Sequence, residues 1–366
     1  MKKSFRCVFS GVLLLVMIIF PGCAGKPAPL ETQKFLADNY DNYLSLEAEE
    51  LVRTGIHYHD QRDYQNALNY YTQALELAPN HPVILYEMGY SYISMGNNDA
   101  ALEMADKGIE EAENRGYTEV IPSLLDLKGS ALDNMGRSEE AINVYLKALN
   151  DYGVSNTFLY YNLAVSYYRI EKREDALEAL AKGLAFNPNH ASSNYLMGKI
   201  CMEDGKSTQA FYALCYFLLL EPNTERALQS YNTILYMLKP EDTIEIGIGV
   251  RDNGAFTASD IVISTAFALD EENFRLSDAE KTKAKLYYIM TSLEDLKNSG
   301  RIQRSGGDEL WWDFYSPFFN RIALSDYFDI YCKYIAISVD PDVDSWIENE
   351  RNKIEAFFGW LNEYLE

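Results

Sequence analysis

The stretch DYQNALNYYTQALELAPN, residues 63–80, contains the alanine and the proline of a pattern that recurs along this chain. Ala67 lies twelve residues after Gly55, and Pro79 closes the segment. Proline ends a helix because it lacks the backbone N–H that the helix needs. The stretch therefore predicts the second helix of a repeated unit, and its counterparts elsewhere decide the fold.

Five copies of the small-residue pattern lie along the chain. The first small residue of each copy is followed twelve residues later by an alanine, and successive copies are 34, 40, 35 and 34 residues apart. Small residues allow two helix backbones to approach closely, so each copy predicts two antiparallel helices with one small residue on each. The pairs are Gly55 and Ala67, Gly89 and Ala101, Gly129 and Ala141, Ala164 and Ala176, and Gly198 and Ala210.

Larger residues, turns and prolines complete each unit. A larger residue lies three positions after the first small one, and we expect it to fill the space beside the close approach. Breaks at Gly96 and Gly136 turn the chain between helices, and Pro188 and Pro222 close two more units. The larger residues are Tyr58, Tyr92, Leu132, Tyr167 and Cys201.

Residues 63–80 closely resemble the second helix of a tetratricopeptide repeat (TPR). The resemblance implies an all-α TPR solenoid of about five helix pairs, followed by a mostly helical C-terminal domain, residues 241–366, with at most a short strand. A helix over residues 225–240 is expected to cap the last repeat. The five repeats together cover residues 48–224, at 48–81, 82–115, 122–155, 157–190 and 191–224.

The first helix of each repeat lines the usual ligand groove in proteins that this chain resembles. Projecting the repeat register onto the chain places aromatic side chains on that wall, and such side chains are typical of binding hot spots. Packing between adjacent repeats is the alternative for each of them, and the sequence leaves it open. The residues are His59, Tyr86, Tyr90, Phe158, Tyr161, Tyr168 and Tyr195.

Some members of the family bind acidic C-terminal tails through a ring of Lys, Arg and Asn in this groove. The equivalent wall here offers Arg53, Asn162, Arg169 and Lys199, scattered among aromatic and acidic residues. That clamp is not reproduced. A peptide, a protein helix or a glycan stacked on the aromatic side chains is therefore the expected ligand.

The N-terminal 22 residues predict a signal peptide. A charged segment, residues 2–6, precedes an apolar run, residues 12–20, that is too short to span a bilayer. The following Phe20-Pro21-Gly22-Cys23 resembles a bacterial lipobox, which implies a lipid on Cys23, although Phe20 and Pro21 depart from the usual pattern. A plain secretory signal is the alternative. Residues 23–47 are expected to be a tether.

Charge and cysteine content exclude several classes of function. The chain carries a formal charge of −23, and a cut before Cys23 would remove three positive charges, giving −23 − 3 = −26. Such a surface repels nucleic acid and anionic lipid headgroups. The five cysteines form no CxxC pair, so neither a zinc site nor a disulfide framework is indicated. Cys201 and Cys215 are expected to be small buried hydrophobes, with a bridge between them as the alternative.

The C-terminal region loses the repeat register. Alternating apolar residues over 244–250 predict a short strand, and helices are expected over about 258–269, 279–298, 312–336 with a break near Pro317, and 345–365. The aromatic run over 311–319 is either the centre of this domain's core or an exposed contact patch. We favour the core.

Three short strings resemble sites of known chemistry without their context. Residues 306–310 read GGDEL, which resembles a diguanylate cyclase signature but lacks flanking strands. Asp340, Asp342 and Asp344 begin like a calcium loop, but the turn glycine and closing glutamate are absent. His57 and His59 do not share a helix face. We therefore expect no catalytic residue, no metal and no cofactor.

These observations predict a lipid-anchored TPR scaffold or adaptor, not an enzyme, that binds a protein or peptide in the bacterial cell envelope. We favour the outer membrane facing the periplasm over the cell surface. A small-ligand or glycan-binding lipoprotein that works with a transporter is the alternative, and an undetected catalytic activity in residues 241–366 is a third. The partner and the oligomeric state are left open.

Overall fold

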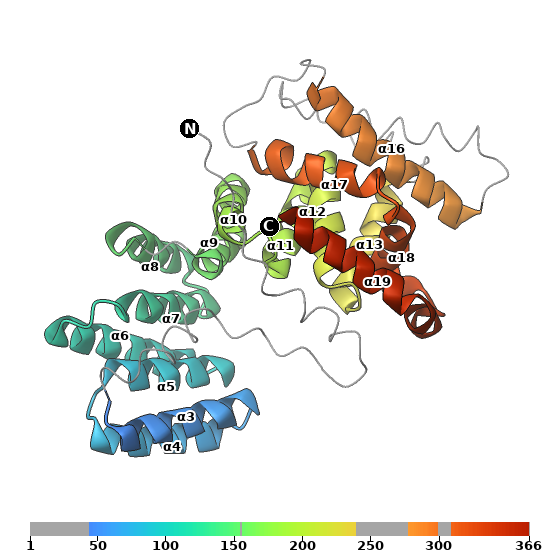
Figure 1. Cartoon of the computed structure of the whole chain (residues 1–366). Coiled ribbons are helices and arrows are strands. Elements are labelled where there is room, and N and C mark those ends of the chain that lie inside the picture. Colours follow the sequence, from blue (N-terminus) through green and yellow to red (C-terminus); the bar gives the residue numbers. More distant parts are fainter. Residues whose placement is uncertain (1–43, 154–155, 239–276, 299–308, 366) are drawn as a thin grey trace. The chain divides into compact units, whose positions relative to one another are not determined.

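Five consecutive helix pairs follow one another along the first part of the described chain (Figure 1). In the computed structural model, residues 44–153, 156–238, 277–298 and 309–365 are described. The pairs are α3 (Leu46–Asp60) with α4 (Tyr64–Leu77), α5 (Pro82–Ser94) with α6 (Asn98–Arg115), α7 (Ile121–Asn134) with α8 (Ser138–Asp151), α9 (Thr157–Arg169) with α10 (Arg173–Phe186), and α11 (Ala191–Glu203) with α12 (Ser207–Leu220). The predicted all-α solenoid of five pairs is confirmed.

The described residues divide into two compact units, one before and one after the boundary between residues 183 and 184, within α10. In the unit that ends at residue 183, each helix contacts the next along the chain from α3 to α9. The first helices of successive pairs also contact one another, α3 with α5, α5 with α7 and α7 with α9. These four helices therefore form one continuous layer.

One turn geometry joins the two helices of every pair. The residue at the same register position in each turn has a left-handed backbone, and the next residue donates its N–H to a carbonyl five positions earlier. Asp63 N lies 2.9 Å from Tyr58 O, for example. This bond ends the first helix in a Schellman motif. The left-handed residues are Arg62, Gly96, Gly136, Glu171 and Gly205, with φ between 61° and 79°.

The small residues lie where the sequence pattern placed close contacts, but a different side chain fills the space beside them. A methyl group at Gly55 or Gly129 would overlap the ring of Tyr71 or Tyr145, sixteen residues along on the second helix of the same pair. At Gly89 the overlapping group is Leu127, from the next repeat. The residue three positions along supplies the carbonyl that the turn bond uses, and the ring of Tyr58 stacks on Tyr70 of the second helix at 5.3 Å.

The 40-residue spacing between the second and third copies has a structural cause. Helix α6 has 18 residues, whereas α4, α8, α10 and α12 each have 14. It ends at Gly116, which adopts φ of 72°. Arg115 in its last turn donates to the carbonyl of Pro79, 2.8 Å away. The longer helix thus accounts for most of the extra residues.

The unit after residue 183 is built around α12, which is buried on all sides. Every residue from Thr208 to Leu219 is buried, as expected for a helix that is apolar all round. Helix α13 (Glu225–Met237), which corresponds to the predicted capping helix, packs on α12. The π-helix η3 (Leu310–Tyr315) and helix α18 (Phe328–Ile335) also contact α12.

Aromatic rings join α12 to the C-terminal helices. The Tyr212 ring stacks on Tyr315 and Phe319 at centroid distances of 6.3 and 5.4 Å. Tyr216 meets Phe318, in α17 (Ser316–Ala323), edge-on at 5.1 Å. Tyr315 also donates a hydrogen bond to Asn194 of α11. The aromatic run over 311–319 is therefore core, apart from Asp313, Phe314 and Pro317, whose side chains are partly or fully exposed.

The remaining C-terminal elements are α16 (Asp278–Asn298), η4 (Ile337–Val339) and α19 (Val343–Leu365). Near Pro317, where the sequence predicts a break, the helix type changes: the π-helix η3 ends at Tyr315, and α17 begins at Ser316 with Pro317 in its first turn. The chain leaves the helical conformation at residues 324–327, between α17 and α18, where no break was predicted. The predicted strand over 244–250 and the helix over 258–269 lie outside the described residues.

Three expectations about cysteines and membrane segments have different outcomes. Cys201 and Cys215 are buried and are not joined by a disulfide, in agreement with their reading as small hydrophobes. Cys23 and the signal segment lie outside the described residues. Across the described ranges, no helix combines the length and apolar character that a membrane span requires.

Candidate functional site

The four first helices α3, α5, α7 and α9 share a face that we call the A-helix face. It consists of the residues at positions 2, 5, 6, 9, 12 and 13 of each repeat, counted from residues 48, 82, 122 and 157. These are Glu49, Val52, Arg53, Ile56, His59 and Asp60 on α3; Val83, Tyr86, Glu87, Tyr90, Ile93 and Ser94 on α5; Ser123, Asp126, Leu127, Ser130, Asp133 and Asn134 on α7; and Phe158, Tyr161, Asn162, Val165, Tyr168 and Arg169 on α9. Side chains at these positions meet across neighbouring helices. Asn162 of α9 donates to Asp126 of α7 at 2.9 Å, and Arg169 of α9 lies 2.6 Å from Asp133 of α7.

Three predicted aromatic positions come together at the α3–α5 end of this face. The His59 ring stacks on Tyr90 with centroids 4.9 Å apart, and Tyr90 is nearly parallel to Tyr86 at 6.4 Å. His59 Nδ1 is in hydrogen-bond contact with Ser91 Oγ at 2.8 Å. Burial lowers the pKa of His59, against the effect of Asp60, so the ring is neutral at neutral pH. Tyr86 is buried, whereas His59 and Tyr90 are half-buried.

The other predicted positions divide between the two units. Phe158, Tyr161 and Tyr168 lie on α9, and each is half-buried. Tyr195 lies on α11 in the unit after residue 183, where its hydroxyl donates to Gln229 of α13 at 3.4 Å and Arg226 covers its ring at 5.3 Å. Tyr195 thus packs against α13. Packing between neighbouring elements is the alternative to groove exposure that the sequence left open.

A carboxylate that the sequence reading did not select lies on the A-helix face. Asp126 occupies the same register position as Tyr86 and Tyr161, and its residue is only partly exposed. Burial raises the pKa of Asp126 to about 6, although the hydrogen bond from Asn162 acts in the opposite direction. The repeat register would have found Asp126, but the search of this wall followed aromatic side chains.

The A-helix face is acidic. Burial, and then the carboxylates of Glu87 and Asp126, raise the pKa of Tyr90, so both carboxylates act at this ring. The two arginines of the face are each held by a carboxylate, Arg53 by Glu49 at 2.6 Å and Arg169 by Asp133. In all, the face carries Glu49, Asp60, Glu87, Asp126 and Asp133 against Arg53 and Arg169.

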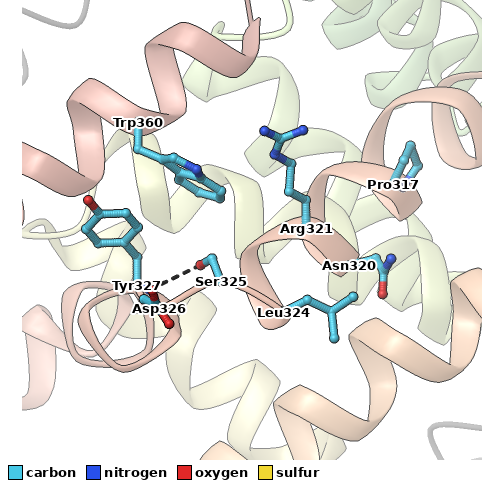
Figure 2. A pocket seen from close by; sticks show the side chains of 8 residues that line it. All are labelled: Pro317, Asn320, Arg321, Leu324, Ser325, Asp326, Tyr327 and Trp360. Carbon is cyan, nitrogen blue, oxygen red and sulfur yellow. Dashed lines mark hydrogen bonds between the residues drawn. The ribbon is translucent and has the colours of Figure 1, made fainter.

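A pocket of about 650 Å³ lies at the turn between α17 and α18 (Figure 2). Two aromatic rings form one side, with Tyr327 and Trp360 at a centroid distance of 5.5 Å. The Arg321 guanidinium lies 5.6 Å from the centre of the Trp360 ring. Tyr327 N donates to Ser325 Oγ at 3.2 Å, which fixes the turn. Pro317, Asn320, Leu324 and Asp326 complete the lining.

The motif-like strings supply no assembled metal centre within the described ranges. No group of three or more His, Cys, Asp or Glu residues suited to a metal ion occurs there. His57 Nε2 lies 2.6 Å from Gln61 Nε2, whereas His59 Nδ1 lies 2.8 Å from Ser91 Oγ. Asp340 Oδ1 accepts the N–H of Asp342 at 2.9 Å, which is a local turn contact. Most of the GGDEL string lies outside the described residues.

Comparisons with known proteins agree with the repeat architecture. Models of the tetratricopeptide repeat match residues 58–117, 122–150 and 159–190, so the chain contains TPR repeats. The fifth pair, α11 and α12, lies outside these matches and is assigned by its register and its helices. TPR proteins act as protein–protein interaction scaffolds or adaptors, and proteins with these repeats are typically not enzymes.

Two plant proteins are among the similar curated sequences. The Hsp70-Hsp90 organizing protein of Triticum aestivum is 30% identical over 155 residues, which are 41% of this chain and 25% of that protein. The Hsp70-Hsp90 organizing protein 3 of Arabidopsis thaliana is 27% identical over 172 residues, 46% of this chain and 29% of that protein. The chain thus spans between a quarter and a third of the length of these relatives.

Solved structures with a similar fold include two bacterial proteins. PilF of Pseudomonas aeruginosa is 17% identical with a TM-score of 0.45, over 65% of this chain and 96% of that one. A thermophilic TPR protein of Thermus thermophilus is 17% identical with a TM-score of 0.43, over 51% of this chain and 99% of that one.

Proposed function

We propose that this protein is a non-enzymatic scaffold or adaptor that binds another protein through the A-helix face. The observation that carries the proposal is the set of half-buried rings His59, Tyr90, Phe158 and Tyr161 on this face, with the buried ring of Tyr86 nearly parallel to Tyr90. Large rings that are half-buried and partly exposed offer contact area without a large ordering cost, as in binding hot spots. The TPR repeats support the same class of function.

Site-specific crosslinking tests this proposal. A photoreactive amino acid in place of Tyr161 should capture one defined partner protein in intact cells, and Tyr90→Ala with Phe158→Ala should reduce the yield at least tenfold. The matched control places the same photoreactive group at Glu103, which is exposed on α6, the second helix of its pair. Equal capture from both positions, or no capture from position 161, would count against the proposal.

We further propose that a lipid on Cys23 holds the protein in a bacterial cell envelope, at the outer membrane facing the periplasm. The support is the charged and apolar segment that precedes Phe20-Pro21-Gly22-Cys23. Labelled palmitate should enter the protein in growing cells, and Cys23→Ser should abolish the label and release the protein from membranes. Cys7→Ser is the control and should keep the label. Membrane release without any loss of label would contradict lipidation at Cys23.

A second candidate function is the binding of a small ligand or a glycan in concert with a transporter. The pocket lined by Tyr327, Trp360 and Arg321 favours it, because aromatic faces beside polar side chains suit a sugar ring. A glycan array probed with the full chain and with Trp360→Ala separates the two functions. Specific glycan binding that requires Trp360 would support the second function, and binding by neither chain would exclude it for arrayed glycans.

A further inference from the structure

We propose that the A-helix face binds a partner segment that carries an arginine or lysine side chain, and that this cation docks between the Tyr90 ring and Asp126. The inference rests on the proposed protein-binding function and adds the chemistry of the partner. It begins from the charges of the face, where five carboxylates stand against two guanidinium groups, which gives −5 + 2 = −3.

The distribution of these charges selects one end of the face. Arg53 lies 2.6 Å from Glu49, and Arg169 lies 2.6 Å from Asp133, so both cations are already held by carboxylates of their own or the neighbouring helix. Glu87 and Asp126 come from adjacent helices, and both act on the Tyr90 hydroxyl. Carboxylates from two adjacent helices therefore contribute negative potential beside Tyr90. A cation bound there would be attracted by both.

The rings at this end suit a cation as well. Tyr90 is half-buried, stacks on His59 at 4.9 Å and lies nearly parallel to Tyr86 at 6.4 Å, so these two rings fix its orientation. A guanidinium or ammonium group is attracted to the face of a tyrosine ring, more strongly where water is excluded. Because burial keeps His59 neutral, the histidine does not repel an incoming cation.

Asp126 is placed to bind a ligand at a cost to the fold. Its carboxyl receives one hydrogen bond, from Asn162 at 2.9 Å, and its burial disfavours the charged form. A carboxylate accepts about four hydrogen bonds, so oxygen lone pairs remain for a donor from the partner. A guanidinium supplies two parallel N–H groups for that purpose. An acidic tail would instead meet uncompensated negative charge, which excludes it as the occupant.

Fluorescence anisotropy with three labelled peptides tests the inference on the full chain. The peptides share a Gly, Ser and Leu framework and differ in three positions, which hold Arg, Gln or Glu. We expect the Arg peptide to bind at least about tenfold more tightly than the Gln peptide, and the difference should shrink at high salt. The Glu peptide should bind least.

Variants locate the interaction. Asp126→Asn should remove most of the preference for Arg over Gln, and Tyr90→Leu should weaken the Arg peptide more than the Gln peptide. Glu103→Gln removes one exposed carboxylate from α6 and should leave the preference unchanged. Melting temperatures identify any variant that fails to fold. If Glu103→Gln reduced the preference as much as Asp126→Asn, the attraction would come from overall charge, and the inference would be wrong.

Failure of this inference is distinguishable from failure of the proposed function. If all three peptides bind alike, and Tyr161→Ala weakens all of them, the A-helix face binds proteins but does not select a cation. If no peptide binds and the photoreactive group at position 161 captures no protein, both proposals fail. Preference for the Glu peptide would overturn the inference alone.

Discussion

Gly129 has no Cβ, and this allows the Tyr145 ring of the second helix to pack directly on the backbone of the first. A methyl group there would overlap the ring of Tyr145, which is almost fully buried and therefore has little room to move. We predict that Gly129→Ala lowers the free energy of unfolding by about 1–3 kcal/mol through overpacking. Denaturant unfolding followed by circular dichroism measures the change.

Gly359 provides the matched control for Gly129. It lies in α19, and an added methyl group would meet nothing within 4 Å. Since alanine is a better helix former than glycine, Gly359→Ala should raise the free energy of unfolding by about 0.5–1 kcal/mol. If both substitutions had the same sign, the close approach at Gly129 would not be a structural requirement.

Asp126 is predicted to make stability depend on pH. Burial raises its pKa from 3.8 in the unfolded chain to about 6 in the folded protein. Its contribution to stability is therefore fully present below about pH 4 and is lost as the pH rises through 6. Asp126→Asn should be more stable than the parent protein at pH 7.5, by about 1–3 kcal/mol, and the two should converge near pH 4.

Thermal unfolding across pH 4 to 8 checks this expectation, with Glu103→Gln as the control that should show no such trend. A parent protein that is more stable than Asp126→Asn at pH 7.5 would show that the charged carboxylate is satisfied in the fold. Stabilisation by Asp126→Asn together with weaker binding of the Arg peptide would be the signature of a residue retained for binding at a cost in stability.

Helix pairs are closed by a left-handed residue that need not be glycine. Glu171 adopts φ of 61°, and Lys172 N still donates to Tyr167 O at 3.0 Å. A side chain in this conformation costs about 1–2 kcal/mol, which glycine avoids while losing some conformational entropy. We predict that Glu171→Gly stabilises the protein by about 0.5–1 kcal/mol in denaturant unfolding.

The converse substitution is the control at an equivalent turn. Gly136 has φ of 79° and occupies the same register position between α7 and α8. Gly136→Ala should destabilise the protein by about 1 kcal/mol, because a Cβ is strained there. If Glu171→Gly destabilised instead, contacts of the glutamate side chain would outweigh the relief of backbone strain.

The repeat helices could be predicted from sequence, whereas the C-terminal breaks could not. A period near 34 residues carries the small residues, turns and prolines of a helix pair in several copies, so each copy supports the others. Pro317 had no such copies. Read alone it indicates a break, but proline is tolerated in the first turn of a helix, and the preceding π-helix η3 gives α17 a new start.

Asp126 shows the same limit at the candidate site. The register predicts which residues face one another across α3, α5, α7 and α9, but not which facing residues are buried enough to shift a pKa. That depends on the packed side chains around them. Tyr195 was assigned to the same wall by register, and only its contacts with Arg226 and Gln229 show that it packs against α13.

Burial of α12 depends on residues more than ninety positions later in the chain. Its continuous apolar run from Phe211 to Leu219 predicts a helix buried on all sides, but sequence does not say by what. The structure gives the cover as α13 on one part of its surface and the aromatic residues of η3, α17 and α18 on another. The last repeat of a solenoid requires such a cover because its outer face has no following repeat.

We predict that a chain ending at Leu238 self-associates. Removal of η3, α17 and α18 would uncover Tyr212 and Tyr216, and each ring buries roughly 150–250 Å² in a folded protein. With the neighbouring apolar residues of α12, the uncovered area would exceed the patches that monomers tolerate. Light scattering and binding of an apolar dye should report this. Tyr212→Gln with Tyr216→Gln should reduce both signals in the shortened chain, whereas a monodisperse shortened chain without dye binding would show that α12 needs no C-terminal cover.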